Sequence, residues 1–133
     1  VGNTDFSLYG APGTAPHNSV PVRWGAGRVI PVPYDFDWTG FVRAPYARPD
    51  PSLGIRNVRQ RAYRGLCRPG LDYEALYASF LARRDELTAV VRDEALLEAD
   101  ERKEALEYLD DFWETLESDR DRTRRIQEAC RPI

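Results

Sequence analysis

Residues 18–35 read NSVPVRWGAGRVIPVPYD, and this stretch decides how the first part of the chain folds. Two runs rich in β-branched and aromatic residues, Ser19–Trp24 and Arg28–Tyr34, flank the loop Gly25-Ala26-Gly27. Such a pattern predicts an antiparallel β-hairpin with a three-residue loop. The three prolines within the two runs cannot donate hydrogen bonds, so the hairpin is expected to be short and to form an edge.

The hairpin is also expected to gather oxygen-bearing side chains at one end. Because the second strand runs back beside the first, Asn18 and Asp35 should arrive at the same end of the ribbon. Asp37 follows shortly after Asp35, and Asp5 lies before the hairpin in Gly-Asn-Thr-Asp. Mg²⁺ prefers a few carboxylate or carbonyl oxygens and keeps its other positions for water and phosphate. The pattern therefore predicts a divalent-cation site that serves phosphoryl transfer.

The order of these motifs resembles that of a known group of enzymes. Asp5, then His17-Asn18 leading into a strand, then Pro33-Tyr34-Asp35-Phe36-Asp37 after the next strand, looks like the catalytic lobe of the atypical kinases. The resemblance is closest to the spore-coat-protein-H-type kinases. It is more distant to the phosphoinositide-type lipid kinases.

The resemblance implies a role for each residue of the motifs. Asp5 is similar to the catalytic aspartate that orients the acceptor hydroxyl and takes up its proton. Asn18 is similar to the metal-binding asparagine, and Asp35 to the aspartate that bridges the metal to the β- and γ-phosphates. Asp37 would hold a second metal or a water. The implied cofactors are ATP and Mg²⁺ or Mn²⁺, and the phosphoacceptor stays unknown.

Each motif also has a structural interpretation. An Asn-x-Asp near a terminus is often a turn in which the side chains cap their own backbone. The alternatives to an active enzyme are a non-catalytic helical interaction or scaffold domain and a pseudokinase. Catalysis requires Asp5, Asn18 and Asp35 to converge on one open pocket, whereas a scaffold lets them scatter or pair with arginines.

Two absences bear on the extent of the chain. The sequence contains no methionine, and Lys103 is its only lysine. A kinase fold places a basic residue and a loop over the nucleotide phosphates, and both come from an N-terminal lobe. We therefore expect residues 1–133 to be a single domain from the C-terminal part of a longer chain, inactive without the missing N-terminal lobe. Its site region would be 1–54 and its helical region 55–133.

The rest of the sequence predicts helices. Val58, Ala62 and Leu66 share a spacing of four among several arginines, which predicts a short amphipathic helix over Ile55–Leu66. The preceding segment, Trp38–Gly54, is either a proline-rich connector or, in the kinase-like interpretation, the activation or substrate-binding segment. The arginine-rich face of 55–66 could bind phosphate or an acidic acceptor, but most such faces are solvated.

Three longer helical stretches are expected after Gly70. Asp72 is a candidate N-cap of a helix that continues to about Val91. Apolar side chains at spacings of three and four predict a second helix around Trp113. Ser118-x-x-Asp121 then opens a third helix that ends near Ala129. The predicted fold is a mainly α α+β domain, with a short hairpin followed by three or four helices, resembling the C-terminal lobe of a kinase.

Composition and cysteines limit the partners and the compartment. A net charge of −3 and a pI near 5.2 give no general affinity for nucleic acid, and no apolar run approaches the roughly 20 residues of a membrane span. Cys67 and Cys130 either form a disulfide or stay as two buried thiols. A disulfide would place the protein outside the reducing cytosol, and free thiols would fit the cytoplasm.

Overall fold

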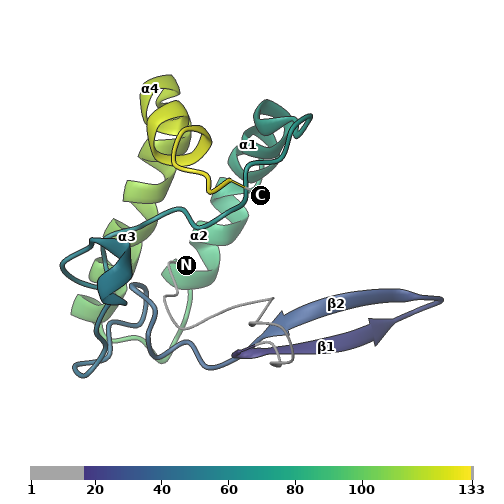
Figure 1. The fold of residues 1–133 in the computed structure, drawn as a ribbon. Coiled ribbons are helices and arrows are strands. Elements are labelled where there is room, and N and C mark those ends of the chain that lie inside the picture. The colour runs from purple at the N-terminus through teal and green to yellow at the C-terminus, as the bar shows by residue number, and fades with distance from the viewer. Residues whose placement is uncertain (1–16, 133) are drawn as a thin grey trace. The chain divides into compact units, whose positions relative to one another are not determined.

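The computed structural model describes residues 17–132, and these residues divide into two compact units (Figure 1). The first unit, the hairpin unit, extends to Arg61, and the second, the helical unit, begins at Ala62. The sequence division expected at Gly54 thus lies within the hairpin unit. In the described residues the architecture is the predicted one, a two-stranded antiparallel hairpin followed by four α-helices, so the mainly α α+β prediction is confirmed.

The hairpin consists of β1 (Ser19–Trp24) and β2 (Arg28–Pro33), joined by the predicted loop. Its register places Pro21 opposite Pro31. Two opposed prolines fit only a position of the ladder where both N–H groups would point away from the partner strand. The loop turns through Gly25 and Gly27, which have φ values of 58° and 95° that glycine adopts at little cost.

A loop region completes the described part of the hairpin unit. It contains one 3₁₀ turn, η1 (Pro51–Leu53), which Asp50 caps by accepting a hydrogen bond from the Ser52 N–H at 2.9 Å. Ala47 and Val58 are the buried apolar residues of this region, with 7% and 5% of their surface exposed. The unit therefore has a small apolar core.

The helix predicted over Ile55–Leu66 does not form, and this prediction was wrong. Side chains bind the backbone here: Asn57 Oδ1 accepts a hydrogen bond from the Arg59 N–H at 3.0 Å, and Gln60 Oε1 accepts one from the Arg56 N–H at 2.6 Å. Such local bonds offer the backbone an alternative to the helical ladder. Of the three apolar positions in the pattern, only Val58 is buried.

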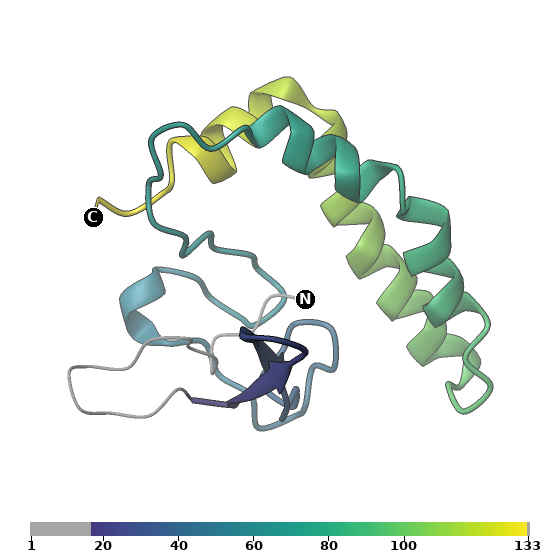
Figure 2. The ribbon, with the colours of Figure 1, turned by 90° about the vertical axis from the view of Figure 1, so that its right-hand side faces the viewer.

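The helical unit contains α1 (Tyr73–Leu81), α2 (Arg84–Arg92), α3 (Ala99–Glu117), α4 (Asp119–Arg122) and a π-helical turn, η2 (Thr123–Gln127). Helix α3 packs along α1 and α2 (Figures 1 and 2). The N-caps Asp72 and Ser118 are as predicted, since their side chains accept from the Ala75 and Asp121 N–H groups at 2.9 and 3.2 Å.

The single helix expected to run to Val91 is instead divided into α1 and α2. At the junction the Arg83 N–H donates to Phe80 O at 3.0 Å, which closes a tighter turn than the α-helical one. Asp85 and Glu86 then occupy the first turn of α2, where acidic side chains favour a helix N-terminus. The core of the unit forms around Tyr77, Trp113 and Leu116, each no more than 2% exposed.

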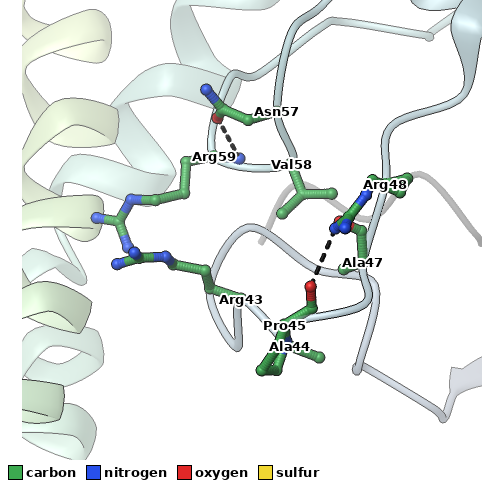
Figure 3. Close-up of a pocket in the computed structure, with 8 residues that line it drawn as sticks. All are labelled: Arg43, Ala44, Pro45, Ala47, Arg48, Asn57, Val58 and Arg59. Carbon is green, nitrogen blue, oxygen red and sulfur yellow. Dashed lines mark hydrogen bonds between the residues drawn. The ribbon is translucent and has the colours of Figure 1, made fainter.

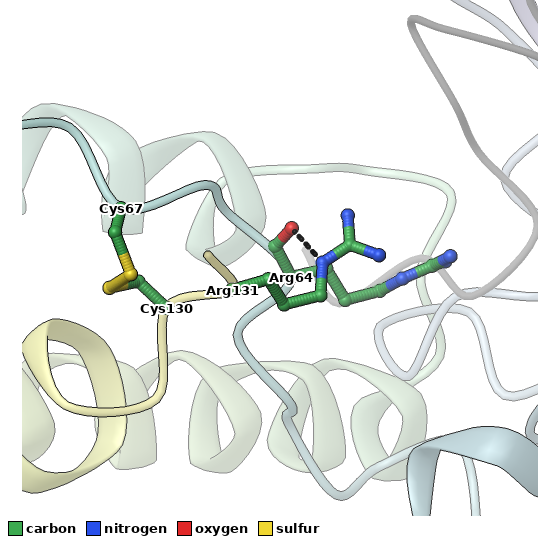
Figure 4. Close-up of a disulfide and its surroundings, with 4 residues drawn as sticks. All are labelled: Arg64, Cys67, Cys130 and Arg131. Atoms are coloured by element: carbon green, nitrogen blue, oxygen red, sulfur yellow. Dashed lines mark hydrogen bonds between the residues drawn. A yellow bond between two sulfur atoms is a disulfide. The ribbon is translucent and has the colours of Figure 1, made fainter. Parts of the chain in front are cut away.

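The two cysteines, left open by the sequence, form a disulfide in the helical unit (Figure 4). Their Cα atoms are 4.9 Å apart. Beside the disulfide, the Cys67 N–H donates to Arg131 O at 2.8 Å and the Arg131 N–H donates to Gly65 O at 2.9 Å. Covalent and hydrogen bonds together attach the last described residues to the start of the unit.

Candidate functional site

The hairpin brings two of the predicted ligands to the same end of the ribbon. Ser19 pairs with Pro33, and the Tyr34 N–H donates to Asn18 O at 3.0 Å, so Asn18 lies beside the residue that precedes Asp35. Asn18 is 6% exposed and Asp35 is exposed. The expected convergence of Asn18 and Asp35 at one end of the hairpin is thus present in the backbone.

Both residues have backbone conformations that restrict which side chains can replace them. The φ values of Asn18 and Asp35 are 51° and 58°, in the left-handed region. Asn and Asp enter this region more readily than other residues with a Cβ. The backbone therefore gives a structural reason for these residue types that stands beside the chemical one. Conservative changes between Asn, Asp and Gly are the ones that leave the turn intact.

Asp37 is fixed by a hydrogen bond from the loop that follows. Tyr46 Oη donates to Asp37 Oδ2 at 2.8 Å. Asp37 Oδ1 is buried and has no hydrogen-bond partner among the described residues, and the same is true of Ser19 Oγ, next to Asn18. Buried polar atoms without partners are rare and call for an explanation such as a bound water or ion.

The turn between Asp37 and Tyr46 is organised by Thr39, which is fully buried. Its Oγ1 donates to Phe36 O at 2.7 Å and accepts from the Val42 N–H at 3.1 Å. The Arg43 N–H donates to Thr39 O at 2.9 Å. A single buried threonine thus fixes the backbone on both sides of the turn. No pattern in the sequence predicts this role of Thr39 or the contact of Tyr46 with Asp37.

The carboxylates act together on Tyr46. The hydrogen bond to Asp37 raises the pKa of the Tyr46 phenol above its ordinary value of 10.0, and desolvation and the negative charges of Asp37 and Asp35 add to the effect. Asp35 and Asp37 therefore both lie close enough to Tyr46 for their charges to raise the pKa of its phenol. This part of the molecule holds two carboxylates, an amide and a phenol around the hairpin end.

We expect Asp37→Asn to lower the pKa of Tyr46 toward its ordinary value, because the substitution removes both the charge and the acceptor that favour the protonated phenol. Asp35→Asn should lower it less, since Asp35 acts through charge alone. In the wild type, the stabilisation from Tyr46 is present below the unfolded pKa of about 10 and is lost as pH rises through the higher folded pKa. NMR of ¹³C-labelled tyrosine through an alkaline titration measures this, and equal shifts in both variants would contradict the hydrogen bond.

Not every predicted residue can be placed. Asp5, the predicted catalytic base, lies outside the described residues. His17, which precedes Asn18, is described and exposed. Within residues 17–132 no three His, Cys, Asp or Glu side chains gather as a metal-binding group. A cation at the hairpin end would therefore rely on two carboxylates, the Asn18 amide and water, which suits Mg²⁺ better than Zn²⁺.

Known proteins add no independent assignment. Comparison of the chain with protein-family models, with curated proteins and with solved structures found no match. None of the helices in residues 17–132 has the length and apolar character of a membrane span.

Proposed function

We propose that the hairpin unit carries the metal and nucleotide site of an ATP-dependent phosphotransferase of the atypical kinase kind. The observation that supports it best is the placement of Asn18 and Asp35 at one end of the hairpin. Two residues further along, the buried Asp37 Oδ1 has no hydrogen-bond partner among residues 17–132. In this proposal Asn18 and Asp35 bind Mg²⁺ or Mn²⁺, and Asp37 assists.

In this proposal the residues of the site need not form any covalent bond with the substrate. Phosphoryl transfer relies on positioning and on neutralising the charge of the phosphate oxygens, and the metal supplies much of both. Asp35 and Asn18 would hold the metal from the two sides of the hairpin end, and the metal would supply positive charge to the phosphate oxygens of ATP. Asp5 would orient the acceptor hydroxyl and take up its proton. The basic groups over the phosphates would come from an N-terminal lobe.

The first test measures binding of a divalent cation by the chain, with Mn²⁺ as the probe and electron paramagnetic resonance as the readout. Asp35→Asn is the informative variant, because it removes the charge yet keeps a residue that tolerates the positive φ. Asp111→Asn, an exposed carboxylate on α3, is the matched control. We expect Asp35→Asn to weaken Mn²⁺ binding at least about tenfold, while Asp111→Asn leaves it unchanged. Equal binding by Asp35→Asn would rule out the metal site.

The second test is Mg²⁺-dependent phosphotransfer from ATP by the full-length gene product. We expect Asp35→Asn to lower the rate by about 100-fold or more, as removal of a preorganised electrostatic group does. Cation binding without ATP turnover by the wild type would reject catalysis and favour a pseudokinase.

A second candidate function belongs to the helical unit alone. This unit has its own core around Trp113 and its own disulfide, so its fold is accounted for without the acidic residues of the hairpin. A non-catalytic interaction domain would need no more than this. Wild-type protein that binds neither Mn²⁺ nor ATP would favour this function.

The disulfide also supports a proposal on compartment. Structural disulfides persist in oxidising environments and are rare in the reducing cytosol. On this basis we propose that the protein works in an extracytoplasmic compartment. Free thiols at both cysteines in protein isolated under thiol-blocking conditions from its natural source would contradict it.

A further inference from the structure

A second polar site lies in the hairpin unit, and the residues that line it are different from Asn18, Asp35 and Asp37. It is a surface pocket of about 560 Å³ (Figure 3). Three arginines, Arg43, Arg48 and Arg59, line it together with Asn57, and the buried Ala47 and Val58 contribute apolar surface. None of the described residues that line it is acidic. Its size is in the range of small-molecule sites.

The walls of the pocket are held by hydrogen bonds within the loop. Arg48 Nη1 donates to Pro45 O and to Ala47 O at 3.0 and 2.9 Å. These bonds fix Arg48 through one of its three nitrogens. On the other wall, the Asn57 side chain holds the Arg59 backbone N–H at 3.0 Å. The arginines are thus presented by an organised backbone, which lowers the cost of binding a ligand.

Arg43 is held in an unfavourable backbone conformation. Its φ is 54°, in the left-handed region that arginine seldom occupies. Glycine or asparagine would fit the same turn with less strain. In Figure 3 the guanidinium ends of Arg43 and Arg59 point to the same side of the pocket. Backbone strain that places a charged side chain in a pocket is typical of functional sites.

We propose that this pocket binds a phosphate group of a small phosphorylated molecule. The guanidinium group is a planar fork of donors that matches phosphate oxygens, and charge-assisted bonds of this kind are the strong ones. Each arginine carries five N–H donors, so phosphate binding is compatible with other interactions of the same side chains. The site needs no divalent cation and does not depend on the proposed phosphoryl transfer.

The test is calorimetric titration of the chain with pyrophosphate, in the presence of a chelator that removes divalent cations. We expect saturable binding that Arg59→Gln and Arg43→Gly each weaken at least about tenfold, which corresponds to the loss of a charged hydrogen bond. Arg43→Gly is chosen because glycine suits the φ of this position, so the variant should melt at the wild-type temperature or above. Arg56→Gln, an exposed arginine of the same loop that does not line the pocket, is the matched control.

Further titrations test which anion the pocket prefers and distinguish the pocket from the proposed metal site. Inorganic phosphate should bind more weakly than pyrophosphate, and citrate should bind more weakly still if the pocket selects phosphate over carboxylate. Asp35→Asn should leave pyrophosphate binding intact, because that residue belongs to the proposed metal site. The proposal is overturned if the wild type shows no saturable binding, if Arg56→Gln weakens binding as much as Arg59→Gln, or if citrate binds as tightly as pyrophosphate.

Discussion

Loss of the Cys67–Cys130 disulfide is expected to lower the free energy of unfolding of the helical unit by about 4 kcal/mol. The two cysteines are 63 residues apart in the sequence, so the bond closes a long loop. In the chain-entropy account, such a cross-link stabilises the protein by restricting the unfolded chain. Since small domains have only about 5–15 kcal/mol of total stability, this single bond is a large fraction of it.

The measurement is urea unfolding of the chain, followed by circular dichroism of the helices, with and without a reductant. The Cys67→Ser and Cys130→Ser double variant is the control, because it should match the reduced wild type and should not respond to reductant. The hydrogen bonds beside the disulfide remain after reduction, but each is worth only about 1 kcal/mol. A loss below about 1 kcal/mol would mean that the unfolded chain is already compact.

The hairpin could be predicted because its information is local. The glycines of the loop and the β-branched runs on either side specify turn and strands without reference to the rest of the chain. The position of Asn18 beside Tyr34 and Asp35 follows from that topology alone. The placement of Asn18 and Asp35 at one end of the hairpin could therefore be predicted from the sequence.

The loop from Phe36 to Arg61 could not be predicted in this way. The spacing of Val58, Ala62 and Leu66 fits a helix, yet Asn57 and Gln60 bind the backbone and hold the segment in turns. The periodicity of apolar residues predicts which face of a helix would be buried. It does not predict whether a side chain takes the backbone hydrogen bonds that the helix needs.

The same limit explains why the arginine pocket and the Tyr46 contact were missed. Arg43 lines the pocket with its backbone in a positive-φ conformation. The Tyr46 hydroxyl contacts Asp37 across a turn that the buried Thr39 stabilises. No sequence rule assigns a left-handed conformation to arginine. The sequence did single out arginines of this loop as candidate phosphate ligands, and of these Arg59 lines the pocket.

The second large effect is expected at Trp113, the largest side chain of the helical core. Trp113 is 1% exposed and clusters with Tyr77 and Leu116, and its ring lies 5.0 Å from that of Phe112. Trp113→Ala should cost about 3–5 kcal/mol, because it removes buried apolar surface and leaves a cavity that the surrounding helices cannot fill. Urea unfolding measures the loss. Trp24→Ala is the control, since Trp24 is 67% exposed on the hairpin and should change stability by no more than about 0.5 kcal/mol.

Trp113→Phe separates the two properties of this side chain. The Trp113 Nε1 is buried and has no hydrogen-bond partner among the described residues, so its N–H is a cost to the folded state. Phenylalanine removes that donor and keeps an aromatic ring in the core. Trp113→Phe should therefore lower the free energy of unfolding much less than Trp113→Ala. If Trp113→Phe is as harmful as Trp113→Ala, the indole N–H has a partner in solution, such as a buried water, and the core is polar at its centre. If only Trp113→Ala is harmful, volume alone makes Trp113 the main packing residue of the helical unit.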